Sequence, residues 1–165
     1  MPLDALCLTA VAGEVRSAVH GGKIDKIYQP TRDEVVLYIR GPAGNVRLLL
    51  SANPGHPRAH LTERNRENPE QPPMFCMLLR KHLQGARILE LNQPPLERIL
   101  DFRLETLDEL GDRVERRLVL EAMGRSANLL LLDGEGRIVD CTRRVDGDLA
   151  VSYTHLRAHE TLRHL

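Results

Sequence analysis

The chain has 165 residues, which is enough for one domain whose core holds it folded without disulfides or metals. Lysine plus arginine and aspartate plus glutamate each number 23, so the net charge is zero and a globally basic nucleic-acid-binding surface is excluded. No apolar run approaches the ~18–20 residues of a membrane span, and the amino terminus lacks the layout of a signal peptide. We therefore expect a cytoplasmic protein with no membrane contact.

The three cysteines lie far apart in apolar stretches, at Cys7, Cys76 and Cys141. An odd number of cysteines at such spacing indicates neither a disulfide framework nor a zinc site. We expect buried thiols in a reducing compartment, and no metal or other cofactor.

The amino-terminal half is predicted to start with a helix. Apolar residues recur at i, i+3, i+4 and i+7 after Asp4, which predicts an amphipathic helix over 5–19 with Asp4 as its N-cap. Gly21 and Gly22 end this helix. Apolar runs then predict an antiparallel meander of three strands, joined by turns at 30–33 and 41–45, with the strands at 23–29, 34–40 and 46–51.

Residues 52–73 contain five prolines and few large apolar residues, which predicts a surface loop. The stretch PPMFCMLLRKHL at 72–83 predicts a buried helix, because two prolines suit a first turn and apolar residues follow them. Arg80, Lys81 and His82 close this helix. Their cations either complement the helix dipole or face phosphate, and the sequence leaves both roles open.

Beyond this helix, five further strands are predicted, at 87–91, 99–107, 116–122, 128–133 and 138–142. The order of helix, three strands, loop, helix and five strands indicates an α+β fold. We expect a mostly antiparallel sheet or sandwich with two main helices.

Three blocks of the sequence carry a family resemblance: SANPGHPRAHLTERNRENP at 51–69, PPMFCMLLRKHL at 72–83 and LEAMGRSANLLLLD at 120–133. In this order, and over most of residues 1–145, the chain closely resembles the N-terminal domain of the NFACT family. The resemblance implies a fold similar to the N-terminal domain of formamidopyrimidine-DNA glycosylases.

The resemblance also implies a function in ribosome quality control. A factor of this family would bind the large (50S) ribosomal subunit that carries peptidyl-tRNA, and would recruit alanyl-tRNA for C-terminal alanine tailing of the stalled chain. The ribosome would make each peptide bond. We therefore expect a domain that positions tRNA and has no catalytic residue of its own.

The end of the chain has a different origin. VSYTHLRAHET at 151–161 matches the translation of a transposon end and adapter used in sequencing libraries. We expect the NFACT N-terminal domain to occupy residues 1–150 and to be incomplete at its carboxyl end, and residues 151–165 to form a disordered, non-native tail. The histidines of that tail therefore do not predict a metal site.

The resemblance assigns three residues to tRNA binding. Glu97 and Arg98 stand where the family has an Asp-Arg pair, with glutamate in place of aspartate, and Asp4 stands at an acidic position of the family before the first helix. Simpler roles stay open for all three. An adjacent acid and base on a turn are typically solvated surface charges, and Asp4 is also a helix cap.

The remaining candidate RNA contacts are Arg58, His60, Arg80, Lys81, Arg125 and Asn128. Arg58 and His60 fall in the proline-rich loop, where a guanidinium group suits phosphate, although acidic neighbours offset much of the charge. Arg125 and Asn128 follow Gly124, where a tight bend would display them toward a ligand. A solvated loop and a plain hairpin turn are the respective alternatives.

Aromatic residues are scarce before the tail, namely Tyr28, Tyr38, Phe75 and Phe102. Base stacking on an aromatic platform is therefore not the expected mode of RNA contact. Contacts to phosphate and ribose are expected instead.

Two other functions are weighed. A surface adhesin for fibronectin is an older label of the family, against which the missing signal peptide and the unpaired cysteines count. A DNA glycosylase or lyase would use the amine of Pro2 as a Schiff-base nucleophile after removal of Met1. Leu3 stands where those enzymes have glutamate, and their zinc finger is missing, so such chemistry is not expected.

Overall fold

The computed structural model describes residues 5–94 and 97–143. Three predictions lie outside these residues: the cap and tRNA-binding roles of Asp4, the nucleophile role of Pro2, and the tail at 151–165. Within the described residues, none of the helices is long and apolar enough to cross a membrane.

The first helix, α1 (Ala5–Val19), has the predicted bounds. Its apolar face is wholly buried, with Leu8, Ala12, Val15 and Val19 at most 1% exposed. Cys7 lies on the other side and is exposed, so the expectation of a buried thiol is wrong there. Cys76 is buried and Cys141 half-buried, and no disulfide joins the three cysteines of the described chain.

In the described part of the chain, nine strands form one antiparallel sheet in the order β4-β3-β2-β1-β5-β6-β7-β8-β9. Their bounds are β1 (Lys23–Thr31), β2 (Glu34–Gly41), β3 (Gly44–Ser51), β4 (Arg58–Leu61), β5 (Arg87–Asn92), β6 (Ile99–Leu107), β7 (Arg113–Glu121), β8 (Asn128–Leu132) and β9 (Ile138–Cys141). The predicted α+β fold, with a large antiparallel sheet and two main helices, is confirmed.

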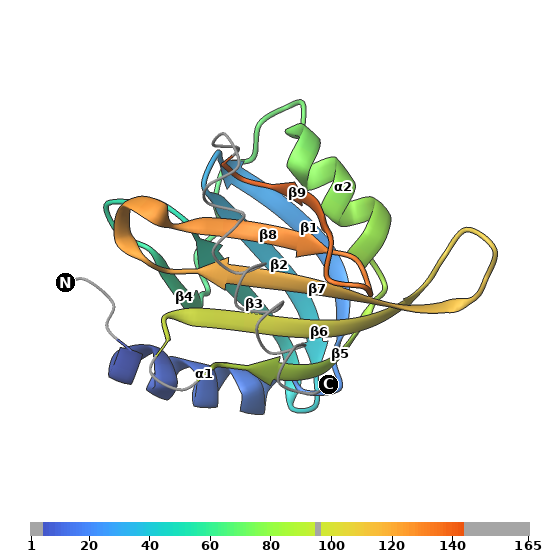
Figure 1. Ribbon diagram of the computed structural model, residues 1–165, viewed down its shortest axis with the longest axis horizontal. Helices are drawn as coiled ribbons and strands as arrows, with labels where there is room; N and C mark the ends of the chain where they lie inside the picture. Colours follow the sequence, from blue (N-terminus) through green and yellow to red (C-terminus); the bar gives the residue numbers. More distant parts are fainter. Residues whose placement is uncertain (1–4, 95–96, 144–165) are drawn as a thin grey trace.

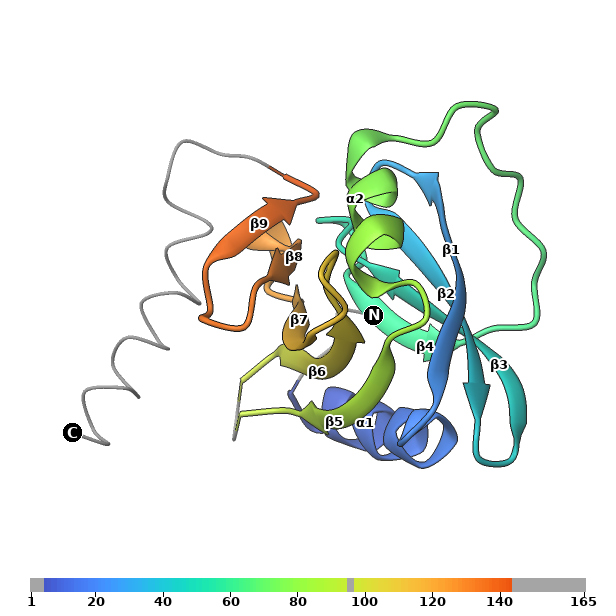
Figure 2. The same cartoon turned by 90° about the vertical axis from the view of Figure 1, so that its right-hand side faces the viewer.

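The sheet bends at the junction of β1 and β5, so that β1–β4 face β5–β9 (Figure 2). The two strands pair only at Lys23 and Arg87, and flanking bonds from Gly85 N to Ile24 O (2.7 Å) and from Ile88 N to Gly22 O (2.8 Å) complete the junction. One apolar core fills the space between the halves. The two helices, α1 and α2 (Met74–Leu83), cover opposite ends of this core (Figures 1 and 2).

The second helix starts later than predicted. Pro72 and Pro73 precede it, and Pro73 is its N-cap in an extended conformation, with φ −61° and ψ 158°. Phe75, Cys76, Leu79 and Leu83 form its buried face. Burial raises the pKa of the Cys76 thiol, although the charge of Arg80 acts against this shift.

The main error in the predicted elements is β4. Residues 58–61 were expected to belong to the loop, yet they pair with β3, from Arg58 opposite Ser51 to Leu61 opposite Leu48. The strand is only four residues long and follows Pro57, so its local signal is weak and the edge of β3 supplies its partner. The loop over 62–73 is confirmed.

A second difference is the length of the β6–β7 hairpin. β7 begins at Arg113, three residues before the predicted start at 116, because charged residues there pair with the far end of β6. This ribbon projects beyond the sheet in Figure 1. Its polar sequence contains no core-facing alternation, so the pattern of apolar residues did not indicate a strand.

Candidate nucleic-acid interface

Glu97 and Arg98 lie in the connection from β5 to β6, which the backbone holds in place. Glu97 N donates to Pro94 O (3.1 Å), Gln93 Nε2 donates to Glu97 O (3.0 Å), and Ala122 N donates to Arg98 O (2.8 Å). Both side chains are half-buried. Within the described residues, no side-chain hydrogen bond or ion pair is found for either residue.

The connection from β7 to β8 contains the turn of 3-10 helix η1 (Gly124–Ser126). Arg125 is exposed on this turn, whereas Asn128 is fully buried. Asn128 Oδ1 accepts bonds from Leu129 N (3.0 Å), Thr142 Oγ1 (2.9 Å) and Arg143 N (3.1 Å), and its Nδ2 donates to Arg143 O (2.9 Å). Arg125 is therefore exposed on the turn, as expected. Asn128 is instead buried, and its side chain ties β8 to the segment after β9.

These two connections lie at the same end of the sheet. Ile99 pairs with Glu121, and Glu121 pairs with Asn128, so the start of β6, the end of β7 and the start of β8 are neighbours. The first turn of α1 lies at this end as well (Figure 1). The structure thus places the connections that carry Glu97, Arg98 and Arg125 at the same end of the sheet, near the helix that follows Asp4 in the sequence. We call Glu97, Arg98 and Arg125 the β5–β6 corner.

Arg58 belongs to a different cluster, which forms around Glu34 at the start of β2. The Glu34 carboxylate accepts bonds from Arg66 Nη2 (2.6 Å), Arg58 Nη2 (3.1 Å) and Thr31 Oγ1 (3.0 Å). Burial alone would raise the pKa of Glu34, but the bonds from Arg66 and Thr31 and the two positive charges lower it below its usual value. Arg58 is therefore engaged in an internal ion pair.

His60 follows Arg58 on the outer face of β4. Its Nε2 accepts from Arg58 Nε (3.4 Å), which leaves Nδ1 to donate to Leu61 O (3.0 Å). The ring lines a hollow of about 550 Å³ between β4 and the loop that follows it. The hollow is also lined by Val36, Leu49, His56, Arg58, Leu61, Thr62, Glu63, Arg64 and Arg66.

The basic end of α2 points in two directions. Arg80 Nε donates to Ile27 O (2.9 Å), and the guanidinium group lies over the ring of Tyr28 at 5.5 Å from its centroid. Lys81 instead forms an exposed ion pair with Glu109 (3.6 Å). Arg80 thus binds the backbone of β1 and a ring, whereas Lys81 stays in solvent, and the roles of helix-dipole complement and phosphate contact both stay predictions.

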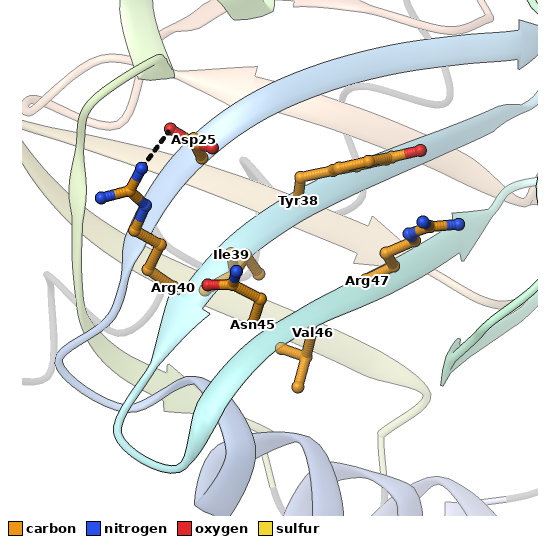
Figure 3. Close-up of a pocket in the computed structure, with 7 residues that line it drawn as sticks. All are labelled: Asp25, Tyr38, Ile39, Arg40, Asn45, Val46 and Arg47. Carbon is orange, nitrogen blue, oxygen red and sulfur yellow. Dashed lines mark ion pairs between the residues drawn. The ribbon is translucent and has the colours of Figure 1, made fainter.

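The outer face of β1–β3 was missed by sequence reasoning. Tyr38 and Arg47 line a hollow of about 250 Å³ there, together with Asp25, Ile39, Arg40, Asn45 and Val46. Figure 3 shows the side chains of Tyr38 and Arg47 extending from neighbouring strands. Asp25 and Arg40 form a 3.8 Å ion pair at the other side of the hollow (Figure 3). Tyr38 and Arg47 pair only in the observed register of the β2–β3 hairpin, from which the predicted turn differs by one residue.

Within residues 5–94 and 97–143, no group of three His, Cys, Asp or Glu side chains is placed to hold a metal ion. The charged groups at the candidate interface are instead arginines and single carboxylates. Such groups are suited to binding phosphate, ribose and base edges.

Comparison with known proteins identifies relatives of this chain. It is 40% identical over 139 residues to the Rqc2 homolog RqcH of Bacillus subtilis, covering 84% of this chain and 24% of that protein. It is 40% identical over 146 residues to the Rqc2 homolog RqcH of Streptococcus suis, covering 88% of this chain and 26% of that protein. The chain thus spans about a quarter of the length of these relatives.

A solved structure has the same fold. It is the N-terminal region of the fibronectin/fibrinogen-binding protein from Streptococcus suis, with a TM-score of 0.85 and 39% identity, covering 88% of this chain and 55% of that chain. Residues 4–153 match the family described as NFACT N-terminal and middle domains. On this match and these identities, the chain belongs to the NFACT family, whose relatives include the ribosome quality control factors named RqcH.

Proposed function

We propose that this chain is the tRNA-positioning N-terminal domain of a ribosome quality control factor. In this function the protein binds the 50S subunit that carries a stalled peptidyl-tRNA and recruits alanyl-tRNA in the cytoplasm. The ribosome then adds the C-terminal alanine tail, so the domain performs no covalent step. The names of the relatives support the quality control function, and the proposed tRNA contact rests on the family resemblance of Glu97, Arg98 and Asp4.

The observation that supports this proposal most is the state of Arg98. Its backbone is fixed to β7 through the bond from Ala122 N, while its guanidinium group pairs with no side chain of the described residues. A half-buried guanidinium group with no partner among the described side chains is suited to binding an external anion. Arg98 differs in this respect from Arg58, which forms an ion pair with Glu34, and from Arg117, which forms one with Asp101.

We assign a role in tRNA binding to each residue of the β5–β6 corner from the chemistry of its side chain. Arg98 binds a phosphate of the tRNA backbone, and Glu97 accepts a hydrogen bond from a ribose hydroxyl. Arg125, exposed on the neighbouring connection, adds a second phosphate contact. Asp4 would complete the acidic part of the site from the start of the first helix. Neither Arg98 nor Glu97 reads bases in this arrangement, so we assign alanine specificity to no residue of this domain.

The test uses the full-length protein in cells whose translation is stalled. Wild type, Arg98→Ala and Arg113→Ala are purified by affinity tag, and the 50S subunits and tRNA that co-purify are quantified by sequencing. Arg113 is an exposed arginine on the same strand pair, at the opposite end of β6 and β7 and roughly 30 Å away from the corner. It therefore controls for loss of one positive charge.

We expect wild type and Arg113→Ala to enrich alanine tRNA on 50S subunits, and Arg98→Ala to keep the subunit and lose most of the tRNA. Equal loss of tRNA in Arg98→Ala and Arg113→Ala would show that tRNA recovery depends on the number of positive charges and not on the position of Arg98. Retention of the tRNA by Arg98→Ala would remove Arg98 from the site.

A second candidate function is binding of fibronectin, which is favoured by the description of the solved Streptococcus suis structure. The discriminating measurement is the location of the full-length protein in intact cells, by surface labelling and by fractionation. Surface-labelled protein that binds immobilised fibronectin would support the adhesin. Recovery only with ribosomes would count against it.

A further inference from the structure

The outer face of β1–β3 carries two aromatic rings between two arginines. The rings of Tyr28 and Tyr38 meet edge to face, with centroids 5.1 Å apart and planes inclined by 65°. Arg47 Cζ lies 4.8 Å from the centroid of Tyr38, and Arg80 Cζ lies 5.5 Å from that of Tyr28. We call these four half-buried side chains, Arg80, Tyr28, Tyr38 and Arg47, the Tyr–Arg row.

Strand register explains why the row faces outward. Tyr38 pairs directly with Arg47 on β3 and with Lys26 on β1, so these side chains share one face of the sheet. The neighbours of Tyr38 on β2, Leu37 and Ile39, point into the core and are 1% exposed. The row therefore does not belong to the packing of the interior.

Two hydrogen bonds hold the arginines of the row in place. Arg80 extends from α2 and is fixed by its 2.9 Å bond to Ile27 O. Arg47 extends from β3, and its Nη1 donates to Asn65 Oδ1 in the loop after β4 (2.5 Å). Side chains that are ordered before binding lose little conformational entropy when a ligand arrives.

The charge around the row is mostly positive. Lys26 and Arg40 are exposed on the same face as Tyr38 and add to the charges of Arg47 and Arg80. Two carboxylates lie near the row: Asp25, whose partner Arg40 is 3.8 Å away with a side chain that is 71% exposed, and Glu63, which lines a neighbouring hollow with Arg47. A flexible polyanion with flat apolar groups complements this combination of cations and rings.

Against the expectation from the scarce aromatic residues, we propose that the Tyr–Arg row binds unpaired bases of RNA, which stack on the outer planes of the guanidinium groups that lie over the tyrosine rings. Lys26 and Arg40 hold the adjoining phosphates. Aromatic rings on a sheet with arginines beside them are suited to single strands, because duplex bases are already stacked on one another. The choice of RNA rests on the proposed function, while the face and the stacking mode do not involve the β5–β6 corner.

The test measures binding of the full-length protein to fluorescent oligonucleotides by anisotropy. The probes are a ten-nucleotide oligo-adenylate, an abasic RNA strand of equal length and charge, and an RNA duplex. We expect the oligo-adenylate to bind at least about tenfold more tightly than the abasic strand, since stacking accounts for the difference.

Variants separate stacking from folding. Tyr38→Leu and Tyr28→Leu remove the rings, and we expect each to weaken oligo-adenylate binding about tenfold while binding of the abasic strand is unchanged. Tyr38→Phe and Tyr28→Phe keep the rings and should retain wild-type affinity. Circular dichroism checks that each variant is folded. Crosslinking of 4-thiouridine RNA to the wild-type protein, mapped by mass spectrometry, locates the contact without any variant and should identify Tyr28 or Tyr38.

Three results would overturn the proposal: equal affinity for the adenylate and abasic strands, tighter binding of the duplex, or crosslinks confined to other faces. Arg98→Ala distinguishes this proposal from the proposed function, because we expect it to lose tRNA on ribosomes and to keep oligo-adenylate binding. If the tyrosine variants bind normally while Arg98→Ala loses tRNA, the Tyr–Arg row fails and the proposed function stands.

Discussion

Glu34 and Arg66 form a 2.6 Å ion pair between Oε1 and Nη2 that connects β2 to the loop after β4. The carboxylate is 9% exposed, and Arg58 binds its other oxygen at 3.1 Å. This buried charge therefore fixes both β4 and the start of the long loop. It also explains why two of the arginines in the proline-rich stretch are not free surface charges.

Glu34→Gln should destabilise the chain by about 1–3 kcal/mol at pH 7, because two partly buried guanidinium groups lose their anion. The pKa of Glu34 is lowered in the folded state, so its contribution is present above the unfolded pKa of about 4.3 and is lost as the pH falls through the folded pKa. Urea unfolding of both forms from pH 7 to pH 3 measures this. A difference between them that does not shrink in acid would contradict the assignment.

His82 should give a second pH dependence. Burial, and then the charges of Arg116 and Lys81, lower its pKa, while Glu109 acts in the opposite direction. The unfolded state, with a pKa of about 6.5, therefore binds more protons, and stability should fall as the pH drops below that value. His82→Gln should remove this slope, and Glu109→Gln should steepen it. Thermal unfolding between pH 8 and pH 5 measures the slope, and identical slopes in all three proteins would refute the prediction.

Replacement of two glycines by alanine should change the free energy of unfolding in opposite directions. A Cβ at Gly41 would collide with the backbone of Ala18, so Gly41→Ala should destabilise the chain by about 1–3 kcal/mol. Gly13 has no atom near the same position in α1, so Gly13→Ala should stabilise it by about 0.5–1 kcal/mol. Urea unfolding at pH 7 compares them. Equal effects would show that the close approach of the β2–β3 turn to α1 is absent in solution.

Substitutions at Asn128 and Arg125 should have different effects: the first should lower stability, and the second should weaken RNA binding. Asn128→Ala removes the acceptor of Thr142 Oγ1 and Arg143 N, while Leu129 N keeps its bond to Thr142 Oγ1, and it should cost about 1–3 kcal/mol. Arg125→Ala changes an exposed side chain and should alter stability by less than about 0.5 kcal/mol. In the full-length protein, we expect Arg125→Ala to weaken tRNA recovery. Unchanged tRNA recovery would leave Arg125 outside the interface.

The sequence predicted both helices and eight of the nine strands of the described residues, because regular apolar periods or uninterrupted apolar runs indicate them. It could not give the pairing that builds the Tyr–Arg row. The turn predicted at 41–45 shifts the β2–β3 register by one residue from the observed pairing of Gly41 with Gly44. A one-residue slip reverses the face of every side chain, so Tyr38 and Arg47 meet only in the correct register.

The candidate site could also be predicted only in part from the sequence. Strand β8 is an uninterrupted apolar run buried on both faces, so no alternation reveals which way Asn128 points. Glu97 and Arg98 came from the family resemblance, because an acid and a base on a turn give no local sign of function. Their assignment to tRNA stays a prediction, and the structure adds Arg125 as their neighbour.

The measurement that tests the central claim most directly is site-specific photocrosslinking on ribosomes. A photoreactive amino acid replaces Arg125 at the β5–β6 corner or, as the control, Arg113 at the far end of β7 in the full-length protein. After irradiation of cells with stalled translation, the crosslinked RNA is sequenced. We predict tRNA at position 125, its loss when Arg98→Ala is added, and none at position 113. Absence of tRNA at position 125, or equal amounts at both positions, would contradict the account.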